Sequence, residues 1–62
     1  MDTIVIHLEL PDEHALALAQ FLKRAGLNAY RQCATDEQEA YAMQEAGDTL
    51  RRALAEQGYA PR

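Results

Sequence analysis

Apolar and polar residues alternate over residues 3–10, directly before a proline. The even positions hold Ile4, Ile6, Leu8 and Leu10, and the odd positions hold Thr3, Val5, His7 and Glu9. A period of two is typical of a strand with one buried face, and the β-branched residues early in the run favour the same structure. We therefore predict a strand over 3–10 that ends at Pro11, because proline has no N–H to donate to a ladder.

After Pro11 the apolar spacing changes to three and four residues, which predicts a helix over 12–25. Asp12 and Glu13 stand in its first turn, where acidic charge complements the positive end of the helix dipole. The predicted apolar stripe consists of His14, Leu18, Phe21, Leu22 and Ala25. Gly26 is expected to end this helix in the left-handed conformation, with Leu27 folding back on Leu22.

A second main helix is predicted over 36–57. Thr35 and Gln38 have the spacing of a capping box, which makes Thr35 the expected N-cap. The predicted apolar stripe consists of Ala40, Met43, Ala46, Gly47, Leu50 and Leu54. Gly47 is compatible with a close helix–helix approach, a local bend or a tolerated glycine, and Gly58 is expected to end the helix. Residues 28–33 fit a short turn or a single helical turn.

The predicted strand has no evident partner within the chain. We expect a mostly helical α+β fold of the β-α-α type, with residues 1–62 forming one small domain. The strand would pair with its copy in a homodimer through Ile4, Ile6, Leu8 and Leu10, and so satisfy its backbone groups. A second strand hidden around 28–34, or a sheet edge left open for another protein, are the alternatives. A chain of 62 residues has a thin core, which also favours association.

Charge and composition narrow the functional classes. The formal net charge of −4 disfavours non-specific binding to nucleic acid or to an anionic membrane. No apolar run approaches the ~20 residues that span a bilayer, and the N-terminus has no basic leader with a signal-length apolar stretch. Cys33 is the only cysteine, which rules out a disulfide within the chain and fits a reducing compartment. We therefore expect a cytoplasmic protein.

Few residues could carry chemistry. The chain has no serine and no evident nucleophile–base pair, and its acidic residues near Pro11 fit a strand end and a helix start. Cys33 is expected to be a small buried residue. His7 and Glu9 repeated across a dimer axis are the one arrangement that could hold a metal. We predict that the protein is not an enzyme and has neither a cofactor nor a metal.

The opening Ile4-Val5-Ile6-His7-Leu8-Glu9-Leu10-Pro11-Asp12-Glu13, followed by a helix that ends at Gly26-Leu27, resembles the start of ribbon-helix-helix repressors. That resemblance covers about the first 27 residues and implies a dimer whose paired strands enter the major groove of DNA. Over its whole length the chain also resembles short uncharacterised proteins of proteobacterial phages and integrative elements. That second resemblance is carried by Leu18 to Arg24, by Glu39-Ala40-Tyr41 and by the ending Gly58 to Arg62.

The favoured function is a small acidic protein-interaction module, an accessory protein of a mobile element that binds or modulates a host complex. Its expected partner-binding residues are Leu16, Lys23, Arg24 and Tyr41, because they occupy the polar helix faces where an apolar or aromatic anchor is exposed. The alternative is a divergent ribbon-helix-helix-like dimer that binds DNA and acts as a regulator. Nucleic acid is a less favoured partner than protein, because the chain is acidic.

Overall fold

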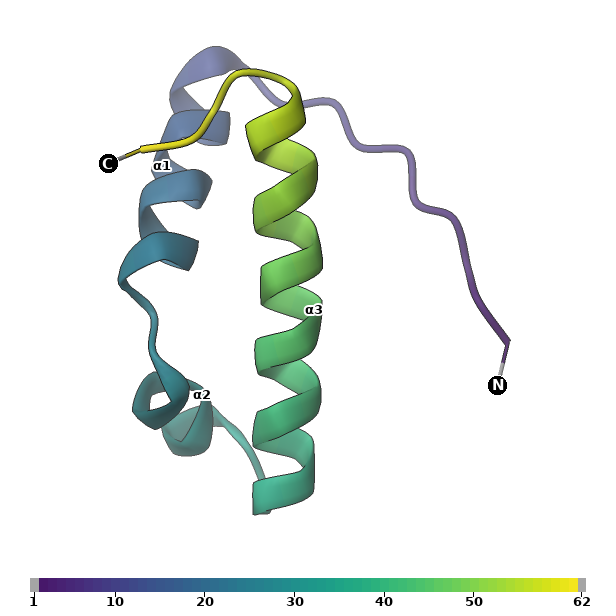
Figure 1. Cartoon of the computed structure of the whole chain (residues 1–62), viewed down its shortest axis with the longest axis vertical. Helices are drawn as coiled ribbons and strands as arrows, with labels where there is room; N and C mark the ends of the chain where they lie inside the picture. The colour runs from purple at the N-terminus through teal and green to yellow at the C-terminus, as the bar shows by residue number, and fades with distance from the viewer. Residues whose placement is uncertain (1, 62) are drawn as a thin grey trace.

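The computed structural model describes residues 2–61, and this part of the chain contains three helices. They are α1 (Asp12–Arg24), α2 (Leu27–Cys33) and α3 (Glu37–Glu56). Helices α1 and α2 both pack on α3: α1 lies beside its C-terminal half and runs antiparallel to it, and α2 lies beside its N-terminal half (Figure 1). Helix α3 is therefore the element against which both other helices pack.

The predicted strand over 3–10, and with it the β-α-α fold, is wrong. Residues 2–10 form an extended N-terminal arm that leaves the helices beside α3, and no β-ladder is present among residues 2–61 (Figure 1). A strand exists only when its backbone pairs with a neighbour. The segment considered as a second strand is helix α2, and none of the backbone hydrogen bonds among the described residues involves the arm. The alternating pattern therefore produces an arm and not a sheet.

The core is made mostly of small residues. The buried apolar side chains are Ala15, Ala19, Leu22, Ala40 and Leu54. Four of them, Ala15, Ala19, Leu22 and Leu54, form the core cluster, and Leu10, Leu18, Leu50 and Tyr59 pack against it. Ala15 and Ala19 lie one helical turn apart on the same face of α1, and their small side chains allow α3 to approach α1 closely. No large side chain among the described residues is completely buried, which leaves the core thin.

Gly47 marks a close approach between α2 and α3. It is buried, and a Cβ atom placed there would overlap the Tyr30 hydroxyl, while lying 3.2 Å from Tyr30 Cζ and 3.5 Å from Leu22 Cδ2. Of the explanations open from sequence, the structure selects the close approach. The missing side chain at Gly47 provides the space that the Tyr30 ring occupies.

The start of α3 is capped one residue later than the sequence predicts. Asp36, and not Thr35, is the N-cap: its Oδ1 accepts a hydrogen bond of 2.8 Å from the Glu39 backbone N–H. Glu39 Oε1 in turn accepts a hydrogen bond of 2.9 Å from the Thr35 backbone N–H. Asp36 therefore caps the helix, since Asp is as good an N-cap as Thr or better, and the Glu39 side chain satisfies the N–H of the residue before the cap.

The two glycine-marked helix ends differ. Gly58 has φ +97°, and the Tyr59 backbone N–H donates to Leu54 O at 2.9 Å, as expected for a left-handed glycine ending. Gly26, by contrast, has φ −98° and serves as the N-cap of α2, so its predicted left-handed conformation is wrong. Leu27 is the first residue of α2, and the chain turns from one helix directly into the next.

Within residues 2–61, no helix combines the length and the apolar character that crossing a bilayer requires.

Candidate interaction surface

The N-terminal arm carries the most exposed apolar side chains of the described chain. Ile4, Val5 and Ile6 are 77%, 96% and 73% exposed, and Leu8 is 55% exposed. Leu10, the last residue before Pro11, packs against the core cluster and anchors the arm to the helices. Of the arm residues predicted to lie in a dimer strand, Ile4, Ile6 and Leu8 are exposed to solvent and Leu10 is partly buried. None of them lies in a strand.

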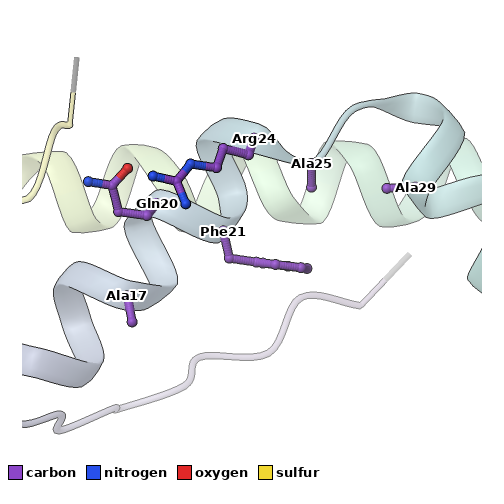
Figure 2. Close-up of a pocket in the computed structure, with 6 residues that line it drawn as sticks. All are labelled: Ala17, Gln20, Phe21, Arg24, Ala25 and Ala29. Atoms are coloured by element: carbon purple, nitrogen blue, oxygen red, sulfur yellow. The ribbon is translucent and has the colours of Figure 1, made fainter.

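A shallow groove lies on α1 and the start of α2, and we call it the Phe21 groove (Figure 2). It is lined by Ala17, Gln20, Phe21, Arg24, Ala25 and Ala29. Figure 2 shows the Phe21 ring extending along the groove towards α2, with the alanines around it and the Gln20 and Arg24 side chains beside each other at one edge. The groove therefore has an apolar floor and one polar edge that carries a positive charge.

Phe21 is 58% exposed, although the sequence places it on the buried stripe of the first helix. The reason is that α3 contacts α1 through Ala15, Ala19 and Leu22, a face that small residues open to close approach. Phe21 points about 100° away from that face, since each residue turns a helix by 100°. The signal that sequence reasoning missed is the pair of alanines four residues apart, which marks the true contact line.

A second hollow separates the arm from α3. Ile6 to Leu10 line it on one side, and Leu50, Ala53 and Leu54 line it on the other. The arm thus lies near the C-terminal half of α3 without closing on it. Its apolar side chains contact the rest of the chain only in part, and Figure 1 shows the arm extending beyond the helices on the side away from α1.

The four predicted partner-binding residues do not form one cluster. Leu16 and Tyr41 are each 48% exposed, Arg24 is exposed and Lys23 is half-buried. Leu16 and Lys23 are seven residues apart and share one face of α1, whereas Arg24 belongs to the Phe21 groove. Tyr41 lies on α3. Leu16 with Lys23 therefore forms one small surface, and Arg24 with Phe21 forms another.

Arg31 is held by its own neighbours. Its Nε and Nη2 donate hydrogen bonds to Glu37 Oε1 and Oε2 at 2.7 and 3.1 Å, and its Nη1 donates to Asn28 Oδ1 at 3.1 Å. The paired Glu37 carboxylate raises the pKa of Arg31. This bidentate contact ties α2 to the first turn of α3, so Arg31 has a structural role and is not a free charge beside Arg24.

The residues considered for chemistry are exposed and do not gather into one site. Cys33 is exposed, so the expectation that it is buried is wrong. His7 Nε2 lies 3.6 Å from Glu9 Oε1, and both side chains are more than four-fifths exposed. Within residues 2–61, no three His, Cys, Asp or Glu side chains gather in a way that could hold a metal ion.

The accessible surface is large for the mass of the chain. A monomeric protein of 6.9 kDa is expected to expose about 4,000 Å², whereas this chain exposes 5312 Å². The radius of gyration is 12.4 Å, where about 10.6 Å is expected for a compact chain of this length. The exposed side chains of Ile4, Val5, Ile6 and Phe21 are part of this surface, so the single chain leaves an unusual area uncovered.

The chain belongs to a family of unknown function, DUF7706, whose model matches residues 1–62. No curated protein and no solved structure gives a significant match. The family assigns no activity, and nothing in these comparisons supports the resemblance to phage proteins or to ribbon-helix-helix repressors. The structure alone therefore carries the functional argument.

Proposed function

We propose that this protein is a non-enzymatic protein-interaction module of the cytoplasm that works as a homodimer. The observation that carries the proposal is the uncovered apolar surface of the single chain. The exposed area exceeds the expectation for a monomer of this mass by about 1,300 Å². A standard protein–protein interface covers about 800 Å² on each partner, so one such interface accounts for much of the excess.

The composition of the core supports the same proposal. The buried apolar residues are two leucines and three alanines, whereas the larger arm side chains Ile4, Val5, Ile6 and Leu8 are exposed. A fully buried Ile, Leu or Phe side chain contributes roughly 1.5–3 kcal/mol relative to an exposed one. Covering Ile4, Ile6, Leu8 and Phe21 in an interface would therefore stabilise the fold substantially.

Thermal unfolding at a series of protein concentrations tests the homodimer. Association stabilises the folded chain by mass action, so the melting temperature is expected to rise as the protein concentration is raised. The circular dichroism of α1 and α3 provides the signal. A melting temperature that stays constant over a hundredfold range of concentration would contradict the proposal.

We propose further that the dimer binds a host protein through the face of α1 that holds Leu16 and Lys23, together with Tyr41. Leu16 and Tyr41 are large side chains that remain about half exposed on well-formed helices, and aromatic anchors are enriched at interface centres.

Affinity capture with matched variants tests this second step. Leu16→Asp and Tyr41→Ala are expected to lose a protein that the unmodified dimer retains, while Gln38→Ala on the exposed surface of α3 retains it. Equal capture by all four chains would place the binding surface elsewhere.

DNA binding is not proposed as a second function. The ribbon-helix-helix resemblance implies paired strands that enter the major groove, and residues 2–10 form no strand. The net charge of −4 also opposes binding to phosphates.

A further inference from the structure

The exposed apolar surface of the chain is divided between two separate features of different shape. The arm is an extended segment with three of its apolar side chains more than 70% exposed. The Phe21 groove is a hollow on α1 and α2 whose lining includes no arm residue. One chain thus presents a projecting apolar segment and an apolar recess that this segment does not fill.

We infer that the arm of each chain occupies the Phe21 groove of a second copy, so that two chains exchange their arms in a closed dimer. This inference rests on the proposed homodimer and identifies the surfaces that form it. A reciprocal exchange uses one arm and one groove from each chain, so the assembly closes with two-fold symmetry and leaves neither surface open.

The lengths of the two surfaces agree. In an extended chain the apolar run from Ile4 to Leu8 covers about 13 Å. Along α1 the groove from Ala17 to Ala25 covers about 12 Å. Side chains on one side of the extended arm, Ile4, Ile6 and Leu8, can therefore all reach the groove at once, because alternate residues point the same way.

The charges agree as well. The apolar run of the arm is flanked by Asp2 and Glu9, and both are exposed. The polar edge of the groove carries the exposed Arg24. An acidic segment that lies in this groove would meet basic charge at its edge, which favours the arm over an arbitrary apolar peptide.

Backbone geometry supports an arm that extends away from its own groove. Pro11 precedes α1 with φ −58° and ψ 153°, which directs the chain away from the helix in an extended conformation. The arm passes beside α3, where Ile6 to Leu10 line the second hollow, and it contributes no residue to the lining of the Phe21 groove. The groove of another copy therefore offers the arm a site that its own chain does not.

Complementation between two defective chains tests the exchange. Ile6→Asp damages the arm and Phe21→Ala damages the groove, and each is expected to weaken the homodimer at least about tenfold in sedimentation equilibrium. In the mixed dimer one arm–groove pair is intact and both changes fall in the other pair. The second change costs little once the first has broken that contact, so the mixture is expected to dimerise more tightly than either chain alone. Phe21 is exposed, so its replacement leaves the core in place.

A charge variant with a matched control accompanies this experiment. Arg24→Glu is expected to weaken the dimer, while Arg52→Glu on the exposed surface of α3 leaves it unchanged. Should a variant chain be unfolded when alone, recovery of helical circular dichroism on mixing gives the same answer.

Three outcomes separate the inference from the proposed function. Loss of the dimer in both variants and recovery on mixing supports the exchange. A dimer that Phe21→Ala leaves intact, or that mixing does not restore, overturns the exchange while the homodimer stands. An unmodified chain that sediments as a monomer overturns both.

Discussion

The Tyr59 hydroxyl donates a hydrogen bond of 2.5 Å to Asp12 Oδ1, across 47 residues of sequence. This contact joins the segment after α3 to the first turn of α1. Tyr59 also packs against the core cluster that contains Leu54. The left-handed Gly58 turns the chain so that Tyr59 can reach both groups, and the two ends of the helical fold are held together at one point.

This hydrogen bond predicts a loss of stability at alkaline pH. The bond to Asp12, then burial and then the negative charge of Asp12, raise the pKa of Tyr59 above its ordinary value of 10.0. The folded state thus favours the protonated hydroxyl, so its contribution is complete below pH 10 and is lost as pH rises through the folded pKa. We expect the free energy of unfolding to fall in that range.

Comparison with Tyr59→Phe isolates the effect. Urea unfolding of both chains between about pH 8 and about pH 12 should show a difference in stability that shrinks as pH rises. The two chains differ only in this hydroxyl, so every other contribution to stability cancels in the difference. A constant difference across that range would show that the hydroxyl contributes nothing that depends on its proton.

Replacement of Gly47 by alanine is expected to destabilise the fold. Alanine is favoured over glycine inside a helix by about 1 kcal/mol, but the added Cβ would overlap the Tyr30 hydroxyl. The end of the Tyr30 side chain would have to shift away from this position on α3. We expect the steric cost to exceed the gain in helix propensity, and chemical denaturation measures the sum.

Two matched variants separate the steric cost from the propensity gain. Ala46→Gly, at an exposed position of the same helix, measures the propensity difference alone. Tyr30→Phe combined with Gly47→Ala should be less destabilised than the sum of the two single changes, since the overlapping hydroxyl is gone. Strict additivity would mean that Tyr30 does not restrict this position.

Leu22 and Leu16 are expected to respond very differently to truncation. Leu22 is 7% exposed in the core cluster, whereas Leu16, on the same helix, is 48% exposed. Leu22→Ala should cost about 2 to 4 kcal/mol, which is a large share of the stability of a small domain. Leu16→Ala should change stability by no more than about 0.5 kcal/mol. Similar losses in denaturant unfolding would contradict the α1–α3 contact described above.

The shifted helix cap provides a prediction that separates the structure from the sequence pattern. Asp36→Ala is expected to lower stability by about 1 kcal/mol, because it removes the acceptor of the Glu39 N–H. Thr35→Ala is expected to cost much less, since its backbone N–H still bonds Glu39. The opposite order in denaturant unfolding would restore Thr35 as the N-cap.

Helical spacing predicts the bounds of the two main helices well. Sequence patterns predict less well those features that depend on contacts between distant parts of the chain. The ranges inferred from the sequence, 12–25 and 36–57, differ from α1 and α3 by one residue at each displaced end. Alternation over 3–10 shows which residues are extended, but it does not supply a partner strand. The sequence therefore predicts that the arm is extended, but it does not predict that its backbone is unpaired.

The candidate site was predictable only in part. The apolar spacing predicts an exposed Arg24, which the structure has, and a buried Phe21, which it does not, because spacing treats leucine and alanine alike. The structure shows that Ala15 and Ala19 define the contact with α3, which rotates the buried face and exposes Phe21. Which side of an amphipathic helix is covered depends on the size of its residues, and spacing alone does not record that.

The most direct test of the central claim is the native mass in solution, measured by light scattering at low micromolar concentration. A second copy that covers the arm and the Phe21 groove predicts twice the chain mass of 6.9 kDa. A helical, cooperatively folded protein with the mass of one chain would contradict the claim, because its exposed isoleucines and phenylalanine would then remain uncovered in the stable state.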